Sequence, residues 1–176
     1  MVDGSEREKL VVFASKLGWM ALKMRGEAIG GLSFGYPSAA AIQAIAPDQV
    51  AMQELSHWQR EVVERLRRYA EGVPVDFSDL SVHSGVATKF QARVLKACRG
   101  IPYGQTLTYG ELALAARTPG AARAVGNCMA SNRVPLIIPC HRVVPAGGGI
   151  GSYSAAEGIA TKHQLLKMEA TNSGKS

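Results

Sequence analysis

The first third of the chain alternates short apolar runs with turn residues. The runs cover residues 10–14, 19–24 and 27–36, with turn signals at residues 16–18 and 25–26 between them. Apolar runs of this length, bounded by glycine and polar residues, predict β-strands. Between residues 49 and 70 the period changes to that of a helix, which Gly72 and Pro74 end. The helical positions are Leu55, Trp58, Val62, Leu66 and Tyr69. This part is expected to be a short antiparallel sheet covered by a helix.

The second half has a helical pattern. Residues 71–87 are rich in Gly, Pro, Ser and Asp and predict a linker; Thr88 is placed to cap a helix that follows. Two short helices, 109–116 and 121–131, flank a turn at 117–120, which is the form of a helix-turn-helix. An apolar strand is expected at 134–138, a Gly-rich loop at 146–151, and a last helix running to about Glu169. The fold class predicted is two-domain α+β: a small α/β domain at 1–80 and a mainly helical domain at 81–176.

Charge is distributed unevenly along the chain. Residues 1–88 hold 9 Lys/Arg and 11 Asp/Glu, whereas residues 89–176 hold 11 and 3. A one-sided positive field suits a polyanion such as nucleic acid, although a basic surface that only aids solubility would look the same.

Other sequence features exclude several classes of protein. No apolar run is long enough for a membrane span, and the charged N-terminus does not resemble a signal peptide. We therefore expect a cytoplasmic protein, or a nuclear one in a cell with a nucleus. Three cysteines without a CxxC pair indicate free thiols. The histidines are scattered, so no metal and no cofactor are expected.

The sharpest local feature is the run of residues 137–144, Ile-Ile-Pro-Cys-His-Arg-Val-Val. His141 and Arg142 follow Cys140 directly, and nearby positive charge is expected to lower the pKa of the thiol and favour the nucleophilic thiolate. Taken alone, this adjacency also fits a buried packing cysteine beside a surface histidine.

Longer segments carry a resemblance to a known family. They are FQARVLKACRGIPYGQTLTYGELA, PGAARAVGNCMASN and VPLIIPCHRVV, and with LLKMEA they cover about residues 90–169. In this order the chain resembles the methylated-DNA–protein-cysteine methyltransferases, or O6-alkylguanine-DNA alkyltransferases. The resemblance implies irreversible, single-turnover transfer of an alkyl group, such as methyl, from flipped-out O6-alkylguanine in DNA; O4-alkylthymine is a further implied substrate.

The resemblance also implies catalytic roles. Cys140 is the alkyl acceptor, His141 takes the thiol proton through a water, and Glu169 orients His141. Asn132 braces the active-site turn. Tyr109 helps to rotate the target nucleotide and protonates the leaving guanine.

Contacts to DNA and to the substrate are implied as well. Arg123 is the finger that fills the gap left by the flipped base; small residues around it let the second short helix press into the minor groove, which is only about 6 Å wide. The expected DNA contacts are Arg123, Ala122, Tyr109, Gly126 and Arg142. The expected substrate pocket is lined by Pro135, Tyr153, Ser154 and Met129. The partner is double-stranded DNA, bound through the minor groove by a monomer.

This chain departs from the family in a few places. The loop after Tyr153 has Ala155 and Ala156 where the family commonly has glycines, and it is two residues longer before the lysine. Met168 replaces a histidine before Glu169. Cys128 stands where a small residue is usual and is expected to pack.

Three other functions compete with repair. A lesion-binding protein would lack the acceptor cysteine, so Cys140 counts against it. A thiol hydrolase would need the side chains of Cys140 and His141 to meet, which adjacent residues rarely achieve. A helix-turn-helix regulator would need base-reading side chains, which the small-residue helix does not offer.

Overall fold

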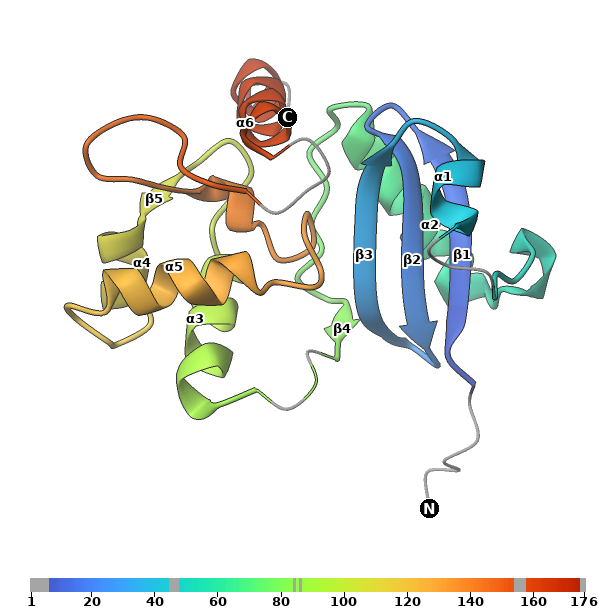
Figure 1. Ribbon diagram of the computed structural model, residues 1–176, viewed down its shortest axis with the longest axis horizontal. Helices are drawn as coiled ribbons and strands as arrows, with labels where there is room; N and C mark the ends of the chain where they lie inside the picture. The colour runs from blue at the N-terminus through green and yellow to red at the C-terminus, as the bar shows by residue number, and fades with distance from the viewer. Residues whose placement is uncertain (1–6, 45–47, 84, 86, 154–157, 175–176) are drawn as a thin grey trace.

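A β-sheet and a group of helices lie side by side in the computed structural model (Figure 1). The structure describes residues 7–44, 48–83, 85, 87–153 and 158–174. The sheet belongs to the first half of the chain and the helix group to the second, so the two-domain α+β prediction is confirmed. The domain boundary at residue 80 stays a prediction.

The sheet has four strands in the order β1-β2-β3-β4. β1 (Lys9–Ser15), β2 (Gly18–Arg25) and β3 (Ala28–Tyr36) are antiparallel neighbours, as the sequence predicts. β4 (Ser81–Val82) is a parallel addition to β3 inside the predicted linker. The linker is therefore partly ordered structure.

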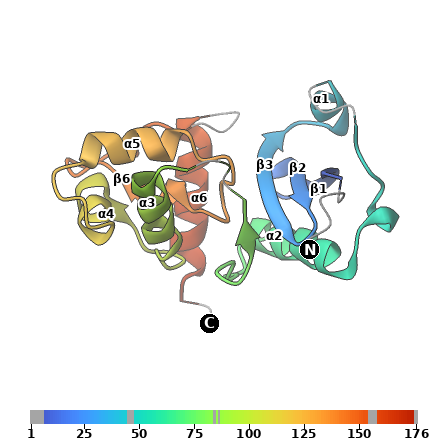
Figure 2. The same ribbon diagram turned by 90° about the horizontal axis from the view of Figure 1, so that it is seen from below.

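Two helices lie on opposite sides of the strands (Figure 2). α1 (Ala39–Gln43) was not predicted, and α2 (His57–Ala70) is the amphipathic helix. α2 begins later than the pattern indicates, because Ser56 and Gln59 cap each other's backbone amides there. A separate 3-10 turn, Met52–Glu54, precedes it.

The second half begins with α3 (Lys89–Arg99), capped by Thr88 as predicted. α4 (Tyr109–Ala115) and α5 (Ala122–Ala130) flank the expected turn, which confirms the helix-turn-helix form. β5 (Leu107–Thr108) pairs in parallel with β6 (Val143–Val144). A 3-10 turn, Cys140–Arg142, leads into β6, and α6 (Ile159–Asn172) closes the fold.

The predicted strand at 134–138 is wrong, because these residues form tight turns. The Ile138 amide donates to the Val134 carbonyl, and the Ile137 amide donates to the Pro135 carbonyl. Leu136 has a φ of +69°, a left-handed conformation that is rare for a side chain of this size. The run is apolar because it is buried between the two halves of the molecule.

These turns join two hydrophobic cores. Val134, Leu136 and Ile137 belong to the core beneath the sheet, whereas Ile138 and Cys140 belong to the core of the helical half. The Leu32 amide on β3 also donates to the Arg133 carbonyl at 2.9 Å. The segment that leads to Cys140 is therefore held from both sides.

Candidate active site

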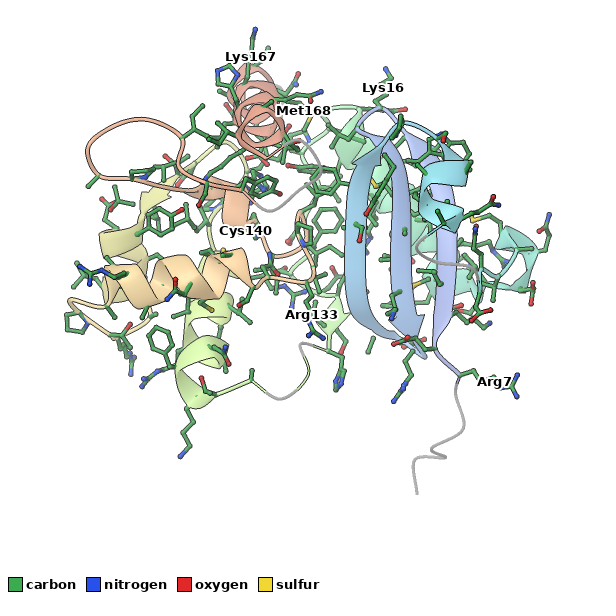
Figure 3. The ribbon with its side chains drawn as sticks, in the orientation of Figure 1. Arg7, Lys16, Arg133, Cys140, Lys167 and Met168 are labelled. Carbon is green, nitrogen blue, oxygen red and sulfur yellow. The ribbon has the colours of Figure 1, made fainter. Side chains whose placement is uncertain are left out.

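Cys140 is buried at the centre of the helical half, with 7% of its surface exposed. In Figure 3 it lies between α5 and α6, and Arg133 marks the border toward the sheet. The β5–β6 pair links the segment after Cys140 to the start of α4, because Thr108 pairs with Val144 and Tyr109 follows directly. This pairing places Tyr109 near the thiol.

Asn132 organises the turn around the thiol. Its side-chain amide donates to the Ile138 carbonyl at 2.9 Å and to the Cys140 Sγ at 3.1 Å, and its side-chain oxygen accepts from the Val134 amide at 3.0 Å. One asparagine therefore fixes both the turn and the sulfur, which is the geometry expected of a brace.

His141 and Glu169 form a buried pair behind the cysteine. His141 Nε2 lies 2.8 Å from Glu169 Oε1, and both side chains are at most 1% exposed. With the proton on Nε2 this nitrogen donates to the carboxylate, which leaves Nδ1 as the acceptor. Nδ1 is buried and has no hydrogen-bond partner among the described residues. It is therefore the atom on which His141 can take a proton.

Glu169 collects donors from several parts of the chain. The Arg142 guanidinium donates to both carboxylate oxygens, the Gly104 amide donates to Oε2 at 3.0 Å, and the Tyr69 hydroxyl donates to Oε1 at 2.5 Å. Burial alone would raise the pKa of Glu169, but the hydrogen bonds from His141 and Arg142 outweigh it and lower the pKa to about 2. The carboxylate therefore stays charged.

The thiol environment differs from the expectation. Burial raises the pKa of Cys140, and the hydrogen bond from Asn132, the charge on Lys162 and the Tyr153 hydroxyl oppose that rise only in part. The neighbouring positive charges in the sequence therefore do not produce a resting thiolate. Burial also disfavours the charged form of His141 and so lowers its pKa, whereas the hydrogen bond with Glu169 acts in the opposite direction.

Arg142 corrects a second expectation, because it is not placed to contact DNA. Its side chain is 7% exposed, donates to Glu169, and reaches the Ile101 carbonyl at 2.6 Å. Sequence position cannot distinguish an arginine buried on a carboxylate from one that faces a phosphate.

Lys162 and Tyr69 were missed by the sequence reasoning. Lys162 is 1% exposed, donates to the Val143 carbonyl at 2.6 Å and interacts electrostatically with Cys140. Its signal was present, since Lys162, Leu165 and Glu169 share one face of α6. Tyr69 was assigned only to the helix pattern, which cannot show where its hydroxyl points.

The other expected DNA-contacting residues lie on or beside α5. Arg123 is exposed, whereas Ala122, Gly126 and Tyr109 are partly exposed. A Cβ built on Gly126 would lie 3.9 Å from the Tyr109 ring, so α5 and Tyr109 form a continuous surface. Burial and the nearby Cys140 raise the pKa of Tyr109, which keeps its hydroxyl protonated.

Two of the expected substrate-pocket residues, Met129 and Tyr153, lie in or against the core that holds the thiol. Met129 is buried in the same core as Cys140, and Tyr153 packs against that core with a hydroxyl that influences the sulfur. Pro135 lies in the turn between the two halves. Ser154 lies outside the described residues.

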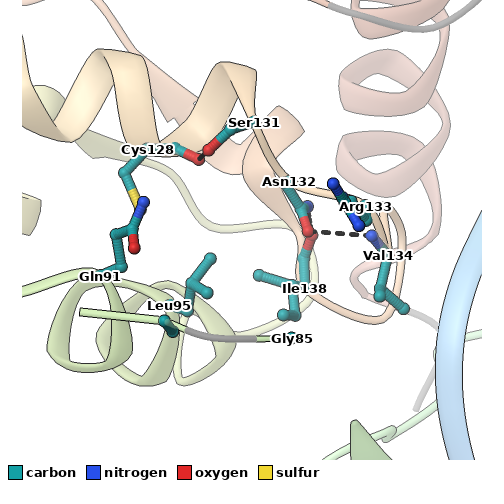
Figure 4. Close-up of a pocket in the computed structure, with 10 residues that line it drawn as sticks. Gly85, Gln91, Leu95, Cys128, Ser131, Asn132, Arg133, Val134 and Ile138 are labelled. Carbon is teal, nitrogen blue, oxygen red and sulfur yellow. Dashed lines mark hydrogen bonds between the residues drawn. The ribbon is translucent and has the colours of Figure 1, made fainter. Parts of the chain in front are cut away.

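A separate pocket of about 220 Å³ is lined in part by Asn132 (Figure 4). Cys128 from α5 and Ser131, which follows the end of α5, line it together with Gln91 and Leu95 from α3. Cys140 is not among its lining residues, so this cavity is separate from the Cys140 thiol. Cys128 is 4% exposed and packs in the helical core, as expected.

Within the described ranges, no three His, Cys, Asp or Glu residues are grouped to hold a metal ion. No helix among those residues is long and apolar enough to cross a membrane.

The fold and site define a class of two-domain α+β proteins that combine a helix-turn-helix with a buried cysteine, which a buried His–Glu pair follows in the chain. The family described as "6-O-methylguanine DNA methyltransferase, DNA binding domain" matches residues 89–171. Methylated-DNA–protein-cysteine methyltransferases of Methanothermobacter thermautotrophicus and Mycobacterium tuberculosis are each 40% identical to this chain. The first alignment covers 64% of this chain and 62% of the relative, less than two thirds, and the second covers 65% and 70%.

Solved structures agree over a larger share of the chain. M. tuberculosis OGT in complex with DNA superposes with a TM-score of 0.71 at 30% identity and 93% coverage of both chains. An O6-methylguanine-DNA methyltransferase from Pyrococcus kodakaraensis has a TM-score of 0.66 at 25% identity, covering 93% of this chain and 99% of its own. The chain belongs to the methylated-DNA–protein-cysteine methyltransferase family.

Proposed function

We propose that this protein repairs alkylated DNA by moving an alkyl group from O6-alkylguanine onto Cys140, irreversibly and once per molecule. The observation that carries the proposal is the Cys140 sulfur, held by Asn132 next to the buried His141–Glu169 pair in a member of this family. The relatives' names state the same transfer, from methylated DNA to a protein cysteine. O4-alkylthymine is a second substrate to test.

The chemistry follows from the arrangement of the site. His141 takes the Cys140 proton on Nδ1, through a water, while Glu169 stabilises the resulting imidazolium. The thiolate attacks the alkyl carbon, a C–S bond forms, and the bond from carbon to guanine O6 breaks. Tyr109 donates a proton to the leaving guanine. The product is a thioether, which no group in the site can cleave, so each molecule acts once.

Access to the alkyl carbon requires that the guanine leave the base stack, at a cost of a few kcal/mol. Arg123 projects from a helix of small residues, which suits insertion from the minor groove into the space left by the flipped base. Tyr109 and the partly exposed Ala122 and Gly126 continue the same surface. Pro135, Met129, Tyr153 and Ser154 are proposed to surround the flipped base. The M. tuberculosis OGT structure in complex with DNA supports DNA as the partner.

We propose that the protein acts as a monomer. Its proposed location is the cytoplasm, or the nucleus in a cell that has one. No cofactor is required, because the cysteine, its base and the leaving-group donor are all side chains of the chain itself.

The test is an intact-protein mass spectrum after incubation with a duplex that carries one O6-methylguanine. We expect one added methyl per wild-type molecule, mapped to Cys140 and absent from Cys140→Ala. Cys128→Ala is the matched control and should gain the methyl normally, since Cys128 lies in the separate pocket. Lesion binding without a mass gain in the folded wild-type protein would contradict repair of this lesion.

A further inference from the structure

The half of the molecule that contains the sheet supplies one side chain to the buried His141–Glu169 pair, called the acid–base pair below. Tyr69 ends the apolar stripe of α2, 100 residues before Glu169 in sequence, and its hydroxyl donates to Glu169 Oε1 at 2.5 Å. The Tyr69 hydroxyl oxygen also lies 3.2 Å from His141 Nε2. A buried tyrosine hydroxyl needs a polar partner, and here that partner is the pair that would activate Cys140.

The Tyr69 ring has little freedom to move away. It is fully buried, and its centroid lies 5.9 Å from that of Phe77 and 6.0 Å from that of Tyr103, the second in an edge-to-face geometry. Burial and the Glu169 charge raise the pKa of Tyr69 well above its ordinary value, so the hydroxyl remains a donor. The sheet half thus holds a fixed donor against the carboxylate.

This contact bears on the function of His141. Nδ1 can accept the thiol proton only while Nε2–H remains directed at Glu169, because the two ring nitrogens alternate between donor and acceptor roles. The Tyr69 oxygen lies beside Nε2, and its proton fixes Oε1, the atom toward which Nε2 points. The Tyr69 hydroxyl and His141 Nε2 both hydrogen-bond to Glu169 Oε1. The bond from Tyr69 therefore reduces how strongly the carboxylate stabilises a proton on the imidazole.

We propose that Tyr69 is a positioning residue for alkyl transfer: through Glu169 it sets the orientation and proton affinity of His141. The N-terminal domain would then take part in the reaction in addition to supporting the fold. This inference rests on the proposed function.

The test compares Tyr69→Phe with Tyr103→Phe. Each variant keeps the aromatic ring, and with it the packing of the two rings against each other, and loses only the hydroxyl. The Tyr103 hydroxyl donates to the Gly72 carbonyl at 2.9 Å and not to the acid–base pair. Two quantities are measured for each variant: the single-turnover methyl-transfer rate at saturating O6-methylguanine duplex from pH 5 to 9, and the affinity for the lesion duplex. The wild-type protein must gain one methyl, which tests the proposed function separately.

For Tyr69→Phe we expect about tenfold slower transfer at pH 7 with lesion affinity unchanged within twofold. The acid limb of its pH–rate profile should move to higher pH, because a carboxylate with one donor fewer holds the proton on His141 more tightly. Tyr103→Phe should show neither change. A Tyr69→Phe protein with the wild-type rate and profile would overturn the inference, as would equal losses of rate and affinity in both variants.

A double-variant cycle tests whether Tyr69 acts through Glu169. Tyr69→Phe added to Glu169→Gln should cause no further loss of rate, whereas additive losses would contradict the proposed route. If Tyr69→Phe does not fold, 3-fluorotyrosine at position 69 keeps the hydroxyl and makes it a stronger donor. The acid limb should then move to lower pH, and an unchanged limb would overturn the inference.

Discussion

At the scale of single residues, Glu169 holds the site together. It is 1% exposed, and two side chains that could be positively charged, His141 and Arg142, contact it from the segment that carries the thiol. A buried carboxylate is stable only when its partners replace water, so loss of any one partner leaves the others buried and unsatisfied. Stability and chemistry therefore depend on the same side chain.

Glu169→Gln should unfold more easily than the wild type by about 3–5 kcal/mol at pH 7, because Arg142 loses its counter-charge. Because the pKa of Glu169 is lowered from 4.5 to about 2 in the folded protein, its stabilisation is complete above pH 4.5 and is lost as the pH falls toward 2. Urea unfolding at several pH values should show the gap between the two proteins narrowing through this range. A gap that stays constant down to pH 3 would contradict this role.

Lys162→Met should make the Cys140 thiol harder to ionise, because the Lys162 charge opposes the effect of burial on the Cys140 pKa. The pH dependence of iodoacetamide modification at Cys140, read by mass spectrometry, should shift to higher pH. Lys167→Met is the control, since Lys167 is exposed on the same helix. An equal shift in both variants would attribute the effect to net charge alone.

At the scale of elements, periodicity predicted β1 to β3, most of α2 and the helix-turn-helix, because each of these buries one regular face. It failed at residues 134–138, where the apolar side chains fill two cores from irregular turns. It also failed to place Arg142 and Tyr69, whose partners lie tens of residues away in sequence. The resemblance pointed to Cys140, His141 and Glu169 as catalytic residues, a role that stays a prediction, whereas the contacts around them could be found only from the fold.

Arg123→Ala tests the proposed role of α5. Arg123 is exposed, so its removal should change the free energy of unfolding by no more than about 0.5 kcal/mol. Methyl transfer from a duplex should slow by about a hundredfold, because base flipping loses its wedge. Transfer from a free O6-methylguanine base, which needs no flipping, should be unaffected. Arg25→Ala, on the exposed end of β2, should leave both reactions unchanged, and a similar loss there would indicate a general charge effect.

At the scale of the whole molecule, the two halves are joined by a hydrophobic core to which both contribute and by hydrogen bonds between them. Leu165 from α6 and the turns before Cys140 contribute to the core beneath the sheet. The Arg99 guanidinium on α3 donates to the carbonyls of Phe77 and Leu80, which belong to the first half. Contacts of this kind couple the folding of one half to that of the other.

Calorimetry should therefore show one cooperative unfolding transition for the full chain, with agreement between calorimetric and van't Hoff enthalpies. Leu136→Ala should lower its midpoint, because a buried leucine truncation costs about 2–5 kcal/mol. Two resolved transitions in the wild-type protein would show that the cores are energetically separate.

The turns at 134–138 also limit how this protein can be recombined with its relatives. Leu136 and Ile137 pack in the core of the half that precedes them. In a chimera joined between the two halves, these side chains would come from one protein and the core around them from another, so the two would not be complementary in shape. A functional hybrid would need those two residues to be exchanged together with the sheet, although they lie only a few positions from Cys140.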